Sequence, residues 1–134
     1  MSLQYSGAVR DAQLDAVETV AGTAPKLQIR SGAAPANCAA ADSGTLLCEI
    51  TLPSDWMAAA SGGSKAKSGT WSGVGVAAGS AGHWRLKNSA GSTTHAQGTC
   101  TATGGGGDMT LDNVSIAVDQ AVSVNTFTLS AGNA

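Results

Sequence analysis

The sequence predicts an all-β protein: an antiparallel β-sandwich or barrel that follows a single N-terminal helix. After residue 25, eight or nine short runs with strand-like alternation follow one another, separated by turns rich in glycine, serine and asparagine. No second helical pattern lies between these runs. A jelly roll and an immunoglobulin-like sandwich share this local pattern, so both topologies stay open. The 134 residues suit one domain, which we divide into a helix or arm over 1–24 and a sandwich over 25–134.

The helix is predicted over residues 6–20, where small apolar residues recur at helical spacing. These residues are Val9, Ala12, Ala16 and Val20. Ser6 is placed to cap the first turn, and Gly22 supplies a stop.

The opposite face of this helix is acidic. Its carboxylates stand at i, i+4 and i+7, namely Asp11, Asp15 and Glu18. Such a ridge is either a solvated face or a docking edge for a basic surface on a partner.

The first strands are predicted on both sides of a long loop. Leu27 and Ile29 alternate with polar residues over 26–30, which predicts a strand with one wet face. Residues 31–44, rich in alanine and including Pro35, are a loop of a length typical of functional or interfacial segments. Residues 45–52 show the clearest alternation in the chain.

The middle of the chain predicts a turn, a strand and a hairpin. Residues 61–69 are expected to form an exposed, flexible turn. Residues 70–78 alternate as a strand that places Trp71 and two glycines on one face and two valines on the other. A hairpin follows, in which Trp84 and Leu86 oppose a polar face, a turn occupies 88–92 and the second strand covers 93–103.

Glycines at 104–107 end that strand. After these glycines, the apolar residues of the alternating pattern switch from one parity of positions to the other twice before the C-terminus. The change at Asp112 and Asn113 predicts a bend, and the change near Asn125 and Thr126 predicts a β-bulge.

Composition argues for association and against several partner classes. Apolar residues make up 43% of the chain but are mostly alanine and valine, so we expect a thin core and a homo-oligomer, a trimer or dimer, or a subunit seated on a larger body. The net charge is −2 and no basic stripe is visible, so direct nucleic-acid binding is not expected. No signal-peptide pattern or apolar run of about 20 residues is present, which predicts a soluble protein without membrane contact.

Reactive groups are scattered along the chain. His83 and His95 make an incomplete metal site and are expected at the surface. Serines lack a nucleophile elbow, and the glycines at 104–107 lack the lysine of a phosphate loop. Asp108, Asp112 and Asp119 could support acid–base or glycosidic chemistry if they converged, but acids in turns are the expectation, with Asp112 and Asp119 bonding to nearby backbone. Three widely spaced cysteines are expected to be reduced thiols. We therefore predict no catalytic, metal or cofactor site and no enzymatic activity.

The three tryptophans allow two interpretations. Trp71 and Trp84 lie in alternating strands and are expected in the core, whereas a sugar-stacking platform would need exposed rings. Trp56, just after the turn at 53–55, is expected to be partly exposed at an interface.

Three segments together resemble small structural proteins of the virions of tailed bacteriophages and prophages. They are LQYSGAVRDA at 3–12, LPSDWMAAA at 52–60 and GGGGDMTLDN at 104–113. The resemblance spans nearly the whole chain but includes no sharp functional motif. It implies a β-sandwich or jelly-roll core and a protein that decorates or cements the outside of the capsid.

The expected function is therefore a capsid decoration protein of the virion that bridges capsomers by binding the major capsid protein. Alternatives are a tail or head–tail connector component and a carbohydrate-binding adhesion module. Contact is expected through the helix and the loop 31–44. The candidate interface residues are Val9, Asp11, Asp15, Glu18, Pro35 and Trp56.

Overall fold

The computed structural model describes residues 3–107 and 109–131 and contains one helix and nine strands within them. The elements are α1 (Gly7–Ala21), β1 (Lys26–Ser31), β2 (Leu46–Thr51), β3 (Ser64–Ala66), β4 (Ser72–Val74), β5 (Gly79–Lys87), β6 (Thr94–Ala102), β7 (Met109–Leu111), β8 (Ser115–Ile116) and β9 (Ala121–Ser130). The predicted all-β class with one N-terminal helix is confirmed, and the strand number agrees with the expectation.

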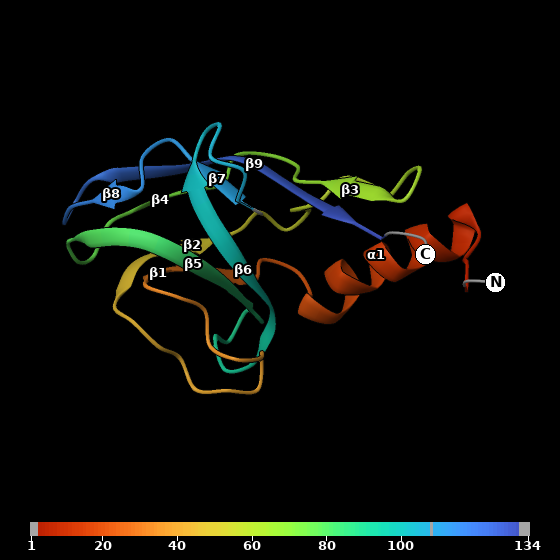
Figure 1. Cartoon of the computed structure of the whole chain (residues 1–134), viewed down its shortest axis with the longest axis horizontal. Helices are drawn as coiled ribbons and strands as arrows, with labels where there is room; N and C mark the ends of the chain where they lie inside the picture. Colours follow the sequence, from red (N-terminus) through yellow and green to blue (C-terminus); the bar gives the residue numbers. More distant parts are fainter. Residues whose placement is uncertain (1–2, 108, 132–134) are drawn as a thin grey trace.

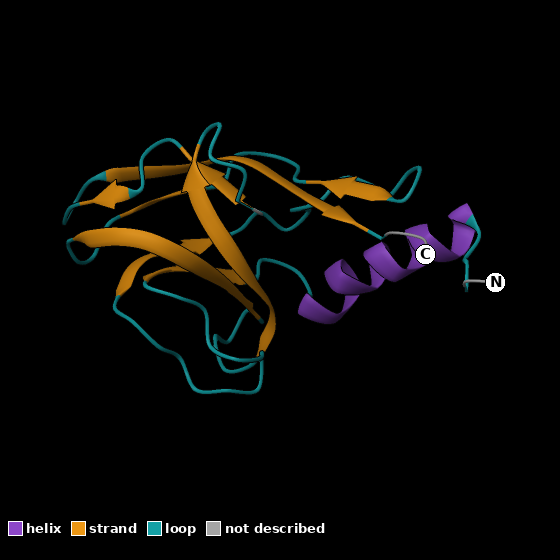
Figure 2. Cartoon of the chain, in the orientation of Figure 1, coloured by secondary structure: helices purple, strands orange, loops and turns teal. Residues whose placement is uncertain are grey.

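The strands form one curled, mixed sheet that folds into a sandwich-like body. Its order is β2-β1-β5-β6-β7-β9-β3, with β4 paired to β9 and β8 paired to β5. Neighbours pair antiparallel except β6 and β7, which run parallel. In Figure 1, β1, β2, β5 and β6 form one layer and β4, β8, β9 and β3 lie along the other. Helix α1 stands beside this body, next to β3 and β6 (Figure 2).

Local chemistry explains the limits of α1. The backbone N–H of Val9 donates to the side chain of Ser6, and Gly22 ends the helix with a φ of 84°, a left-handed conformation that favours glycine. Helix and caps match the prediction to within one residue.

Alternation also places the strand faces correctly. Trp71 is buried, whereas Val74 and Val76 on the opposite parity are about half exposed. Gly75 is required because a Cβ there would lie 2.2 Å from the carbonyl oxygen of Ala117. The predicted bulge is confirmed: Thr110 pairs with Thr126 and Leu111 with Val124, so Asn125 is the extra residue of β9.

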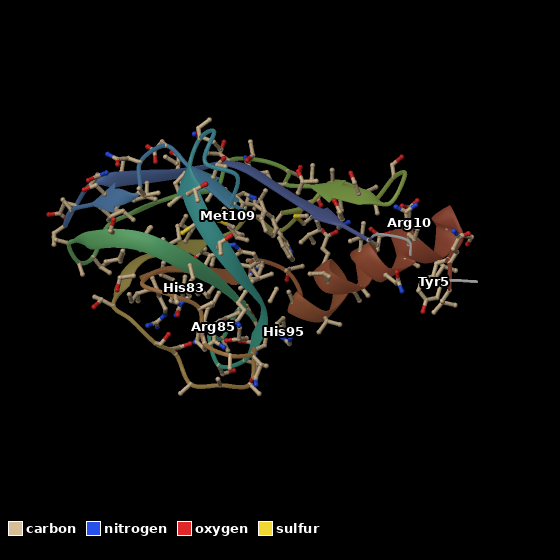
Figure 3. All side chains as sticks on the ribbon, viewed as in Figure 1. Tyr5, Arg10, His83, Arg85, His95 and Met109 are labelled. Atoms are coloured by element: carbon tan, nitrogen blue, oxygen red, sulfur yellow. The ribbon has the colours of Figure 1, made fainter. Side chains whose placement is uncertain are left out.

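The core between the layers is fuller than composition suggested. Four aromatic rings form a continuous row, with ring centroids 6.0 Å apart for Trp56 and Trp71, 5.4 Å for Trp71 and Phe127 and 5.0 Å for Phe127 and Trp84. Met109 is also fully buried in this region (Figure 3). The accessible surface of 6453 Å² is close to the roughly 6,400 Å² expected of a compact monomer of this mass. A need for association therefore does not follow from the core.

Candidate functional site

Helix α1 is attached to the sandwich by its charged face. Arg10 Nε donates to the carbonyl of Ala131 at 2.6 Å, and the carboxylate of Asp11 accepts from the backbone N–H of Gly63 at 2.8 Å. Leu14 and Ala21 are buried on this side of the helix, and Val17 packs against the core beside them. The face that the sequence assigned to solvent or to a partner thus binds the chain's own 58–66 segment.

Lys65 completes this attachment from the opposite side. Its ammonium lies 2.7 Å from Asp15 Oδ1 and 2.9 Å from Glu18 Oε1, and it donates to the carbonyl of Ala58 at 2.8 Å. Burial alone would lower the pKa of Lys65, but the hydrogen bonds to both carboxylates outweigh it and raise that pKa. The hydrogen bond from Lys65 also lowers the pKa of Asp15.

Two sequence interpretations are corrected here. The acidic ridge of Asp11, Asp15 and Glu18 is neither a purely solvated face nor a free docking edge, since all three carboxylates have partners within the chain. Residues 61–69 are not merely an exposed turn, because they contain β3 with Lys65 only 2% exposed. The turn-like composition of residues 61–69 gave no weight to Lys65. A lysine flanked by small residues is the one feature of this segment that could have indicated a buried ion pair.

The apolar stripe of α1 faces outward as a result. Val9 is 44% and Val20 63% exposed, and Ala12, Gln13 and Ala16 between them are exposed as well. At the C-terminal half of the stripe, a cavity of about 270 Å³ is lined by Gln13, Ala16, Val17, Val20 and His95. Figure 3 shows His95 at the start of β6, beside the end of α1. Of the candidate interface residues, Val9 lies on this exposed stripe.

The second long-range contact is the loop between β1 and β2, which covers the polar face of the sheet. Gln28, Arg85 and Gln97 form a row across β1, β5 and β6. Gln97 Nε2 donates to the carbonyl of Pro35 at 2.7 Å. Pro35, expected at an interface with a partner, therefore contacts the chain's own β6 through its backbone.

Arg85 holds the middle of this loop in place. Its guanidinium donates to the carbonyls of Asn37, Cys38 and Ala40 and to Asp42 Oδ1 at 2.5 Å, and the side chain is only 1% exposed. The expectation of a wet face for residues 26–30 is wrong at Gln28, which is 7% exposed, because the loop covers this face of the sheet and its backbone carbonyls supply acceptors that water would otherwise provide. Figure 3 shows Arg85 and His83 on this lower side of the sheet.

Asp42 is the acidic centre of the covered face. Its Oδ2 lies 2.6 Å from the Lys87 ammonium and 3.2 Å from Arg30, in addition to the Arg85 bond. Burial raises the pKa of Asp42, but the hydrogen bonds from Lys87 and Arg85 and the charge of Arg30 outweigh this and lower it.

The histidines do not form a metal site. His83 is fully buried, with Nδ1 2.9 Å from the carbonyl of Gly32, so the expectation of a surface position was wrong for it. It pairs with Thr99, four residues along β6 from His95. Within residues 3–107 and 109–131, no group of three or more metal-ligating side chains comes together. Asp108, one of the three acids weighed for acid–base chemistry, lies outside the described residues.

The tryptophans are all in the core. Trp56, Trp71 and Trp84 are 0%, 1% and 3% exposed, and each indole N–H donates to a backbone carbonyl. The expectation of a partly exposed Trp56 was wrong: its ring packs on Trp71, and its Nε1 donates to the carbonyl of Gly22 at 2.9 Å. A sugar-stacking platform built from these rings is therefore overturned.

The three cysteines are free thiols with different environments. Burial raises the pKa of Cys48 to about 11, with a contribution from Glu49, and burial raises the pKa of Cys100 to about 11. Cys38 is partly exposed on the loop. Among the described residues, α1 is too short and too polar to cross a membrane as a helix.

Comparisons with protein-family models, with curated proteins and with solved structures found no match to this chain.

Proposed function

We propose that this protein is a structural subunit of a virion, a capsid decoration protein that stabilises the head by bridging capsomers, and that it docks through α1. The observation that carries the proposal is the orientation of the helix. Its charged face is bound within the chain, while its apolar stripe of Val9, Ala12, Ala16 and Val20 faces outward.

This orientation differs from the usual one, although Leu14, Val17 and Ala21 pack inward beside the charged residues. A surface helix normally packs its apolar stripe on the core and leaves its charges in water. Here the ion pairs of Lys65 with Asp15 and Glu18 hold the charged residues inward, and the stripe stays at the surface. A contiguous apolar surface held in this way is typical of a site that a partner covers.

The proposed partner is the major capsid protein, which would bury the stripe in an apolar groove. The resemblance of the three sequence segments to small phage structural proteins supports this assignment. A tail or head–tail connector component remains the rival, since it would use the same surface at a lower copy number. Carbohydrate binding is not proposed, because the three indole rings that it required are buried.

The copy number in purified particles tests the location. We expect the chain to be present in about as many copies as the hexameric or pentameric units of a head require, in the hundreds, when particles are quantified by mass spectrometry. A dozen copies or fewer would exclude decoration and favour the connector or tail. Absence from particles would overturn both.

A charge placed on the stripe tests the docking surface. Val20→Lys should reduce incorporation by about tenfold or more, because a buried lysine has no partner in an apolar groove. Val118→Lys is the matched control, because Val118 is 59% exposed between β8 and β9, outside α1. Unfolding of both purified variants should resemble that of the wild type. Normal incorporation of Val20→Lys would rule out the stripe as the docking surface.

A further inference from the structure

A cavity of about 530 Å³ opens between the loop and the hairpin of β5 and β6. Its walls include Cys38 and Asp42 from the loop, Arg85 and Lys87 from β5, and Thr93 and Thr94 from the start of β6 and the turn before it. It lies on the opposite side of the sheet from the aromatic core, and it shares no lining residue with the cavity at α1.

Positive charge is in excess at this cavity. Arg30, Arg85 and Lys87 converge on the single carboxylate of Asp42, and their side chains are only 12%, 1% and 9% exposed. Arg30 also donates to the side-chain oxygen of Gln28, and the amide nitrogen of Gln28 donates to Glu49. A second carboxylate is thus linked to Arg30 through Gln28. Arg85 is compensated by three loop carbonyls. In the described part of the chain, Lys87 has neither a second carboxylate nor a backbone carbonyl to balance its charge.

Hydrogen-bond donors are also in excess. Within the described residues the Lys87 ammonium donates one hydrogen bond, to Asp42 Oδ2, although it carries three protons. Arg85 Nε is buried without a partner there. The hydroxyls of Thr93 and Thr94 make no side-chain hydrogen bond to the rest of the described chain. Both oxygens of Asp42 are already engaged by the cations.

An anion with several oxygens supplies what this cavity lacks, namely negative charge beside Lys87 and acceptors for the donors around it. We propose that the cavity is an oxyanion-binding site, with Lys87 as the charge partner and the hydroxyls of Thr93 and Thr94 as further donors. The ligand class is a phosphate or carboxylate group, carried either by a free ion or by an acidic side chain of a partner. The proposal is independent of α1 and of the virion assignment.

Cys38 provides a reporter inside the cavity. Iodoacetamide is uncharged and should alkylate Cys38 selectively in the folded protein, because Cys48 and Cys100 are buried with pKa values near 11. Inorganic phosphate, glutarate and chloride are compared at equal ionic strength, with peptide mass spectrometry to locate the adduct. We expect phosphate or glutarate at millimolar concentration to slow alkylation of Cys38 several-fold and chloride to leave it unchanged.

The two anions separate the possible sources of the ligand. Protection by phosphate alone indicates a tetrahedral ion or phosphate ester, and protection by glutarate indicates a carboxylate such as an acidic side chain. Protection by neither anion, or equal protection by chloride, would overturn the proposal.

Two variants test the assigned donors. Lys87→Met should weaken the protecting affinity by about tenfold, the effect expected for loss of a charge-assisted hydrogen bond. The double variant Thr93→Val, Thr94→Val keeps every charge and should weaken it by a smaller factor. Lys67→Met, which removes the same charge in a segment that does not line the cavity, should leave protection unchanged. Full protection in both Lys87→Met and the double threonine variant would refute the site.

Discussion

Two ionic clusters hold this molecule together across long stretches of sequence, and their charges are unbalanced in opposite directions. Beneath α1, one buried ammonium, that of Lys65, meets two carboxylates. Beneath the β1–β2 loop, one carboxylate, that of Asp42, meets three cations. Each cluster thus attaches a segment to the sandwich, but one carries surplus negative charge and the other surplus positive charge.

Exposure explains why the two clusters have different consequences. The surplus negative charge under α1 belongs to side chains that water reaches, with Asp15 51% exposed and Glu18 27%. The surplus positive charge at Asp42 belongs to side chains that are 12% exposed or less. Hydrated charge costs little, whereas buried charge needs a partner. The α1 cluster is therefore complete as it stands, and the Asp42 cluster is suited to accept an anion.

The largest effect is expected from breaking the Asp42 cluster at its most buried member. Arg85→Met should destabilise the protein by about 3–4 kcal/mol, because three loop carbonyls and Asp42 lose a buried donor. Urea unfolding measures this loss, and hydrogen exchange should show opening of residues 37–42. Arg30→Met, a more exposed member of the same cluster, should cost only about 1 kcal/mol. Equal effects of the two variants would show that burial does not govern this cluster.

Breaking the α1 cluster should have a smaller effect. Lys65→Met should cost about 2 kcal/mol, since water can hydrate Asp15 and Glu18 once their cation is lost. Proteolysis between α1 and β1 should accelerate while the sheet stays protected. In Lys67→Met the loss of stability should be under about 1 kcal/mol, because among the described residues that lysine makes two weak contacts, one over the Trp71 ring and one to the carbonyl of Gly69. An α1 that stays equally protected in Lys65→Met would contradict its attachment by charge.

Low pH should weaken the Asp42 cluster. The pKa of Asp42 is lowered in the folded state from its ordinary value of 3.8, so its stabilising effect is fully present above that value and is lost as pH falls through the folded pKa. Unfolding measured from pH 6 to pH 2 should therefore show a fall in stability below about pH 4. Asp42→Asn should start less stable and show a shallower fall, whereas Asp55→Asn, an exposed control, should follow the wild type. An unchanged acid profile in Asp42→Asn would show that the carboxylate is not ionically coupled.

Much of the fold could be predicted because it depends on residues that are close together in the sequence. The cap at Ser6, the parity of Trp71 against Val74 and the bulge at Asn125 each depend on chemistry within a few positions. The burial of polar faces depends on something else. Alternation over 83–87 shows that His83, Arg85 and Lys87 share a face, but only a loop 40 or more residues earlier decides that the face is covered.

The docking surface on α1 stays a prediction, and the structure leaves Val9 exposed there. The helix was identified as a contact element, and its outward-facing Val9 was among the residues chosen. Trp56 was expected to be partly exposed and is buried, and the carboxylates of the acidic ridge are bound within the chain, whereas Pro35 stays a prediction. The error has one cause: unpaired charges and a tryptophan after a turn look exposed when the segments that pair with them are distant in sequence. The cavity at Lys87 was missed for the same reason.

The sequence by itself determined the all-β class, the helix with its caps, the strand parities and the bulge, since backbone conformation and side-chain alternation are local properties. Only the tertiary structure decided which polar faces are buried, which face of α1 is left outside, and where cations outnumber carboxylates. Those outcomes depend on burial and on partners brought together from distant segments, because the free energy of a charge is set by the water and counter-charges around it.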